Sequence, residues 1–142
     1  MLFQYPVALE QNEDGVIARF VDVPEAITFG DDEEHALHEA QDALVVALAM
    51  YIDDRQVIPS GSKPRRGQPL VCLNPLVAAK VALHNALIES KISNVRLASM
   101  MGLRENQIRR MLDLDHQSHI RPIEHGLRLL GYELIMHVSK VA

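Results

Sequence analysis

The sequence GDDEEHALHEAQDALVVALAMYI, residues 30–52, decides the fold of this chain. Its apolar side chains recur every three to four residues from Ala36 to Ile52, for about five turns, which predicts a helix with one buried face. The first turn is acidic, and negative side chains stabilise the positive end of a helix dipole. We expect Asp31 to cap the helix, with Glu34 three residues later.

Short segments rich in β-branched and aromatic residues lie on both sides of this helix. Residues 3–9 (FQYPVAL) and 16–21 (VIARFV) predict a β-hairpin, in which Gly15 supplies the positive φ that such a loop needs. Residues 26–29 are a candidate third strand, and residues 70–73 are a candidate fourth strand after the helix. The N-terminal part is therefore predicted to be a βββαβ module of the α+β class.

Residues 59–69 (PSGSKPRRGQP) contain three prolines, two glycines and two serines. This composition, which has no apolar periodicity, is typical of a linker or an exposed loop. We interpret it as a linker between two domains. Residues 1–58 then form the first domain, which the strand at 70–73 would extend, and residues 74–142 form the second.

The second domain is predicted to be mainly helical. Asn74 and Pro75 suit a helix cap and the first helical position. Short polar or glycine-containing breaks divide the rest into four compactly packed helices. The expected helices are residues 75–90, 94–101, 104–113 and 121–130.

The C-terminal residues alternate as a β-strand does. The face that would be buried carries Tyr132, Leu134, Met136 and Val138. A lone strand after a helical bundle needs a partner, and the simplest partner is the same strand of a second copy across a two-fold axis. We therefore expect a homodimer, or a tetramer of such dimers, with these four residues at the dimer contact.

Charge is unevenly distributed along the chain, which has a net charge of -5. Residues 1–58 hold 13 Asp and Glu side chains against only Arg19 and Arg55, whereas residues 69–142 hold nine Lys and Arg against six acids. Opposite charges on two domains favour two different partners, one basic and one anionic.

Several classes of protein are excluded by composition. The single cysteine, Cys72, permits neither an internal disulfide nor a thiolate zinc cluster. Signal-peptide features and long apolar runs are both missing, so we expect a soluble cytoplasmic protein without a membrane partner. The nearby His35 and His38 are best explained as solvated helix residues. The sequence predicts no cofactor, no metal site and no catalytic residues.

Residues 93–112 (SNVRLASMMGLRENQIRRML) have the pattern of a helix-turn-helix. Ala98 lets the two helices cross closely, and Gly102 permits a tight turn. The outward face of the second helix suits the major groove, because Arg, Asn and Gln pair with base edges and Arg neutralises phosphate. The alternative is a solvated polar face on an ordinary helical core. This outward face carries Arg104, Glu105, Asn106, Gln107, Arg109 and Arg110.

This segment resembles the Xre/Cro-type helix-turn-helix family. The residues that carry the resemblance are Ser93, Asn94, Leu97, Ala98 and Gly102. It implies that Arg104 to Gln107 and Arg110 occupy base-reading and phosphate-binding positions. Asn94 stands where the family usually has a phosphate-binding Gln, and its shorter amide reaches phosphate less well.

The N-terminal part resembles the HicB antitoxin family. The matching residues are Tyr5, Pro6, Gly15, Phe20, Asp22, Pro24, Ala26, Thr28, Gly30, Ala36, Ala40, Ala43 and Leu44. The resemblance implies a partial RNase H-like fold that binds and masks a HicA-type toxin, a small basic ribonuclease that cleaves mRNA, while the C-terminal domain binds operator DNA and represses the operon. The acidic charge suits a basic partner. From charge and exposed position alone, the candidate toxin-binding residues are Asp22, Glu25, Asp31, Asp32 and Glu34.

Two alternatives stay open at this point. The chain could be a DNA-binding repressor whose N-terminal domain senses a small ligand, or one whose acidic module binds another basic protein. The absence of tryptophan and the presence of only three Phe and three Tyr argue against a large aromatic pocket. A magnesium-dependent nuclease is disfavoured, because only Asp22, Asp31 and Asp32 are candidate strand-end carboxylates.

Overall fold

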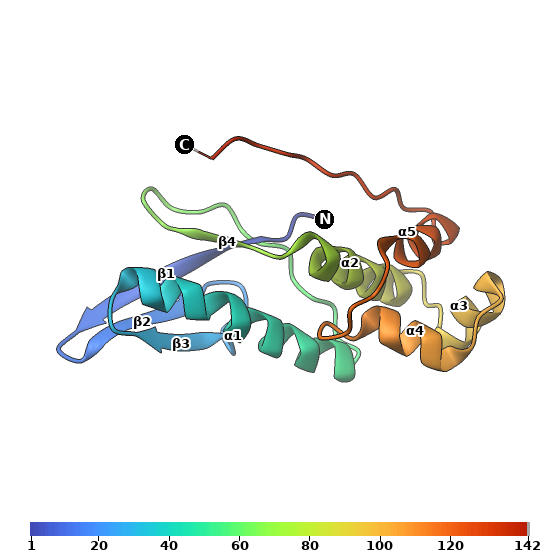
Figure 1. Cartoon of the computed structure of the whole chain (residues 1–142), viewed down its shortest axis with the longest axis horizontal. Coiled ribbons are helices and arrows are strands. Elements are labelled where there is room, and N and C mark those ends of the chain that lie inside the picture. Colours follow the sequence, from blue (N-terminus) through green and yellow to red (C-terminus); the bar gives the residue numbers. More distant parts are fainter. Residues whose placement is uncertain (142) are drawn as a thin grey trace. The chain divides into compact units, whose positions relative to one another are not determined.

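The computed structural model describes residues 1–141 and divides the chain into two compact units, residues 1–78 and the residues from Ala79 onward (Figure 1). Over the described residues the chain has a mixed α+β fold with a four-stranded antiparallel sheet and five helices. The predicted α+β class is therefore confirmed, and the division between the units falls inside a helix.

The sheet of the first unit contains all four predicted strands. They are β1 (Gln4–Asn12), β2 (Gly15–Phe20), β3 (Ile27–Gly30) and β4 (Leu70–Cys72), in the order β3-β2-β1-β4. Between β1 and β2 the turn is held by the Asn12 side chain, whose Oδ1 accepts hydrogen bonds from the N–H groups of Asp14 and Gly15 at 2.9 and 3.1 Å. Gly15 has the expected positive φ, 150°.

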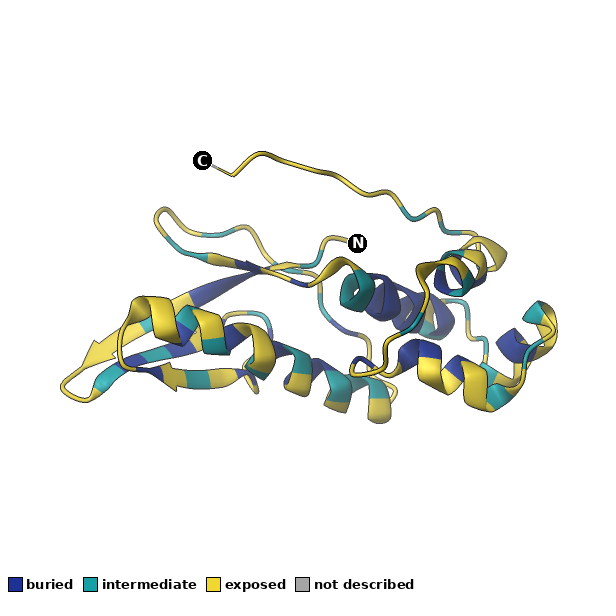
Figure 2. Cartoon of the chain, viewed as in Figure 1, coloured by how far each residue is buried: buried dark blue, intermediate teal, exposed yellow. Residues whose placement is uncertain are grey.

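Helix α1 (Glu33–Asp53) covers one face of this sheet (Figures 1 and 2). Its buried face is made largely of alanines, which allow the helix backbone to approach the strands closely. The helix buries Ala36, Ala40, Leu44, Ala47 and Leu48, and the sheet buries Tyr5, Val7, Val16, Ala18 and Phe20. The buried residues of α1 therefore recur every three to four residues, as the sequence predicted.

The cap of α1 differs from the prediction by one residue. Asp32, not Asp31, is the N-cap, and its Oδ1 accepts a hydrogen bond from the N–H of His35 at 2.8 Å. The cause is strand pairing: β3 continues to Gly30, which pairs with Val16, so the helix begins later than its acidic run suggests.

Residues 59–69 form an irregular loop of the first unit and not the predicted linker between domains. The Tyr5 hydroxyl donates a hydrogen bond to the Pro59 carbonyl at 2.8 Å, and the Val7 N–H donates to the Pro69 carbonyl at 2.9 Å. Both ends of the loop are therefore fastened to β1, through contacts between residues far apart in the sequence.

The four predicted helices follow, each within one residue of its expected ends. They are α2 (Pro75–Glu89), α3 (Asn94–Met101), α4 (Glu105–Leu112) and α5 (Ile120–Leu129). Every residue of α2 from Ala79 to Leu87 is buried. Helix α5 passes close to α2 at Gly126, where an added Cβ would lie 3.2 Å from Leu83 Cδ1. A glycine at this position therefore permits the close packing of the two helices.

The predicted strand at Tyr132–Val138 is not formed within this single chain. The segment contains no helix or strand in the described residues, and most of it is exposed. A strand requires a hydrogen-bonded neighbour, and no other segment of the same chain pairs with this one. The dimer contact through Tyr132, Leu134, Met136 and Val138 remains a prediction, because it needs a second copy.

We predict that Asp32→Ala lowers the free energy of unfolding by about 1 kcal/mol, because it removes the side-chain acceptor at the start of α1. Asp31→Ala is the matched control: it removes an equal charge one residue earlier and should have a smaller effect. Urea denaturation measures both values. If Asp31→Ala proved the more damaging substitution, the assignment of the cap would be wrong.

Candidate partner and nucleic-acid surfaces

Helices α3 and α4 meet through a tight turn at Gly102. This residue has a φ of 67°, in the left-handed region that favours glycine, and the N–H of Leu103 donates to the Ala98 carbonyl at 2.9 Å. Ser93 caps the start of α3 by accepting from the N–H of Arg96 at 3.0 Å. Ala98 and Ile108 are buried between the helices, as predicted.

The start of α4 uses some of the residues that were predicted to contact DNA. The Arg104 N–H donates a hydrogen bond to Gln107 Oε1 at 2.9 Å, so this amide oxygen is occupied at the helix terminus. The next residue, Glu105, forms an ion pair with Arg109, with 2.9 Å between Glu105 Oε2 and Arg109 Nε. These contacts orient the side chains along the helix and reduce the number of groups that are free to bind bases.

Asn106 and Arg110 of α4, together with Arg104 at its N-cap, remain the most available polar side chains here. All three are exposed, and neither arginine forms an ion pair within residues 1–141. A guanidinium group without an acidic partner can bind phosphate or a guanine edge without first breaking an ion pair. Asn94 differs: it is half-buried, and its Oδ1 is shielded from solvent without a hydrogen-bond partner in the described chain.

The far end of α4 is held by a buried lysine that the sequence analysis missed. Lys80 of α2 is fully buried, and its three ammonium N–H donors lie within hydrogen-bonding distance of three main-chain carbonyls and one hydroxyl. The acceptors are the carbonyl oxygens of Arg110 at 3.1 Å, Asp113 at 2.5 Å and His116 at 2.8 Å, and Ser118 Oγ at 2.8 Å. Burial lowers the pKa of Lys80, and the nearby carboxylates of Asp113 and Asp115 oppose that shift. The signal in the sequence was a lone cation within the apolar run VAAKVAL.

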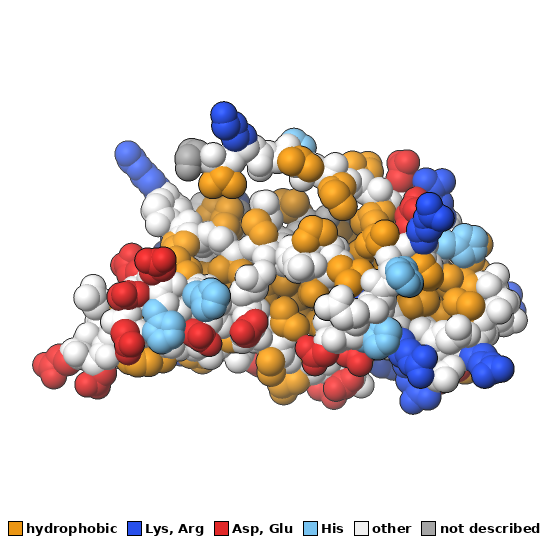
Figure 3. Space-filling view, in the orientation of Figure 1, with side chains coloured by type: hydrophobic (Ala, Val, Ile, Leu, Met, Phe, Trp, Pro, Cys, Tyr) orange, Lys and Arg blue, Asp and Glu red, His pale blue; other side chains and the backbone are white. Residues whose placement is uncertain are grey.

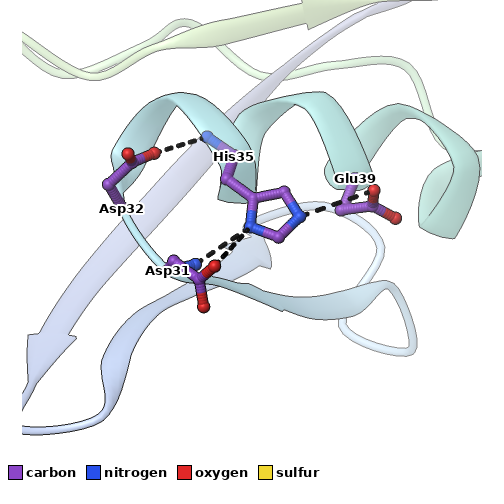
Figure 4. Close-up of polar contacts among 4 residues, drawn as sticks. All are labelled: Asp31, Asp32, His35 and Glu39. Atoms are coloured by element: carbon purple, nitrogen blue, oxygen red, sulfur yellow. Dashed lines mark hydrogen bonds and ion pairs between the residues drawn. The ribbon is translucent and has the colours of Figure 1, made fainter.

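The acidic residues at the start of α1 surround a histidine (Figure 4). His35 Nδ1 accepts a hydrogen bond from the N–H of Asp31 at 3.0 Å, while its Nε2 lies 3.7 Å from Glu39 Oε1. Asp32 is occupied as the cap. The Asp31 carboxylate is 89 % exposed and lies 3.7 Å from the same ring, so it stays open to a partner.

Two other predicted toxin-binding residues have structural roles within the first unit. Asp22 accepts hydrogen bonds from the N–H and the hydroxyl of Ser62, at 2.8 and 3.0 Å, and so fastens the 59–69 loop. Glu25 accepts from the Tyr51 hydroxyl at 2.9 Å. Glu34 is exposed and makes no ion pair within residues 1–141. The structure thus distinguishes Asp31 and Glu34 from the other three candidates.

A metal site or a ligand pocket would be an alternative to these surfaces. No three His, Cys, Asp or Glu side chains within the described chain converge as a metal would require. A shallow open hollow of about 270 Å³ is lined by Leu2, Gln4, Gly61, Ser62, Lys63, Pro64 and Leu70, with no aromatic ring. None of the helices in residues 1–141 has the length and apolar character to cross a membrane.

Comparison with known proteins gives a consistent result. Residues 4–82 match the family model described as HicB_like antitoxin of bacterial toxin-antitoxin system. The chain is 41% identical over 131 residues to antitoxin HicB 2 of Photorhabdus laumondii, covering 92% of this chain and 93% of that protein. It is 35% identical over 140 residues to antitoxin HicB of Pseudomonas fluorescens, covering 98% and 96%. Antitoxin HicB of Escherichia coli is 35% identical over 132 residues, covering 92% and 96%.

We predict that Lys80→Met lowers the free energy of unfolding by about 2–4 kcal/mol, because it leaves buried carbonyl groups without a donor. Hydrogen exchange of residues 110–118 should also accelerate. Lys140→Met, on the exposed C-terminal segment, is the control and should leave both measurements unchanged. Equal stability of the two variants in urea denaturation would contradict this role for Lys80.

Proposed function

This chain belongs to the HicB-like antitoxin family of bacterial toxin-antitoxin systems, and on that basis we propose that it neutralises a HicA-type toxin by direct binding and represses its own operon. Antitoxins of this family are not enzymes. In this proposal the first unit, with a partial RNase H-like fold, masks a small basic ribonuclease that cleaves mRNA. The second unit, an Xre/Cro-type helix-turn-helix, binds operator DNA in the cytoplasm.

The observation that supports the toxin-binding half is the exposed acidic charge at the start of α1. Asp31 and Glu34 remain exposed after the cap and the internal hydrogen bonds have used Asp32, Asp22 and Glu25. An exposed acidic surface attracts a basic protein over a distance and orients it during association. Such attraction weakens as the salt concentration rises.

The DNA-binding half is supported by the exposed face of α4. Arg104 is the N-cap of this helix, Asn106 and Arg110 lie on it, and hydrogen bonds fix both its start and its end. A single helix of this length makes few contacts, so strong binding requires two half-sites. We propose that a dimer formed by pairing of the 132–138 segments supplies the second half-site.

The alternatives proposed from the sequence predict different partners. A ligand-sensing repressor needs an enclosed pocket with convergent polar groups, and the open hollow beside the 59–69 loop does not support this reading. A different basic protein in place of the toxin would use the same acidic surface. A growth-rescue assay distinguishes the two hypotheses, because a chain that binds some other basic protein would not relieve the toxicity of a HicA-type toxin.

The first test is co-expression with a HicA-type toxin, followed by pulldown over a salt series and a growth-rescue assay. We expect tight binding and full rescue by the native chain. The double substitution Asp31→Lys and Glu34→Lys should weaken binding by about tenfold or more at low salt, because it places two cations against a basic partner.

The charge-reversal control is Glu133→Lys, at an exposed position of the C-terminal segment. It should bind and rescue as the native chain does. Asp32 is left intact in these variants, because changing it would also destabilise α1. Failure of the native chain to bind or rescue would refute the antitoxin assignment for the toxin that is used.

We predict that Arg104→Ala and Arg110→Ala each weaken operator binding by about 1–3 kcal/mol, since each removes a cation that can contact a base or phosphate. Arg128→Ala in α5 is the matched control, because this arginine already pairs with Glu124 at 3.1 Å. Fluorescence anisotropy at one fixed salt concentration gives the three affinities. Equal losses in all three variants would point to general charge and against base reading by α4.

A further inference from the structure

A second part of the α1 surface has no role within the first unit. Counting every fourth residue from Glu34 gives His38, Asp42, Val46 and Met50, which form a continuous line that winds slowly around the helix, because side chains four apart are neighbours on its surface. All five are exposed, Val46 at 65% and Met50 at 55%. This line is distinct from the alanine-rich face that packs on the sheet.

The line has an apolar centre between acidic ends. Val46 and Met50 follow Asp42, and Asp53 and Asp54 come three and four residues after Met50. Figure 3 shows the same order of side-chain types along α1. Acidic and histidine side chains cover its first half, and exposed hydrophobic groups and further acids lie toward its C-terminal end. An apolar centre within a charged rim is the usual anatomy of a protein-protein interface.

The acids at the C-terminal end of α1 are unfavourable for the isolated helix. Asp53 is the last helical residue and Asp54 is the C-cap, and the last turn contains no basic residue. Negative charge at this end opposes the helix dipole by a few tenths of a kcal/mol. A cationic partner placed there would reverse the sign of that interaction.

We infer that the outer face of α1 around Val46 and Met50 is the apolar centre of the toxin-binding surface. The inference rests on the proposed function and extends it, because it adds a hydrophobic anchor to the acidic residues at the start of the helix. The matching partner surface has an apolar patch that is bordered by Lys or Arg on both sides. A basic toxin provides such a border.

Charge also argues against the other occupants of this face. In a two-fold pairing of α1 with a second copy, the acidic ends at Glu34 and at Asp53 would face other acids, because both ends of the line are negative. DNA would be repelled for the same reason. The basic protein is the occupant whose charge both ends of the line attract.

The test is the double substitution Val46→Thr and Met50→Gln in the full chain, which removes apolar surface but keeps similar size and charge. Binding to an inactivated HicA-type toxin should weaken at least tenfold in a titration calorimetry experiment. Val95→Thr in α3 is the matched control, because Val95 is 66% exposed and also lies on a helix, and it should bind as the native chain does.

Each outcome has a defined meaning. If the native chain and the double variant bind the toxin equally while Asp31→Lys with Glu34→Lys binds less, the inference is overturned and the proposed function survives. If the native chain does not bind, the proposed function itself fails. If the double substitution instead dissociates a homo-oligomer in gel filtration, the face is a self-contact and the inference is wrong. Circular dichroism confirms that each variant remains folded.

Discussion

The buried ammonium group of Lys80 stabilises the second unit at the C-terminal end of the short helix α4. Lys80 fills its hydrogen-bonding capacity with acceptors between Arg110 and Ser118, so the chain after α4 is folded around this lysine. Helix α4 has only eight residues, and isolated helices of that length are unstable in water. The direction in which α4 presents its arginines therefore depends on a residue of α2.

The first unit relies on close packing instead of a buried charge. Alanines at Ala36, Ala40 and Ala47 allow α1 to lie against the strands, and Gly30 ends β3 where a side chain would overlap the helix backbone. With one face of α1 committed to the sheet, its polar residues must lie on the outer face. Placement of the acidic surface thus follows from the packing of the core.

Local patterns predicted most of the fold, whereas contacts between distant residues decided the rest. Helix periodicity and strand alternation located nine elements of residues 1–141, because both depend on which faces are buried. The cap was misplaced by one residue, since the pairing of Gly30 with Val16 cannot be read locally. The loop at 59–69 and the role of Lys80 were missed for the same reason. The strand predicted at 132–138 stays a prediction, because a strand needs a hydrogen-bonded neighbour and residues 1–141 supply none there.

The same distant contacts narrow the candidate sites. Sequence charge alone treats all acids of the first unit as equivalent, but the fold uses Asp22 to hold a loop, Glu25 to bind a tyrosine hydroxyl and Asp32 to cap α1. The folded state would become less stable if a partner bound these three side chains and broke their internal hydrogen bonds. A partner can bind the remaining charged side chains without breaking these internal contacts, and those side chains are exposed at or near the start of a helix in the first unit and on or beside α4 in the second.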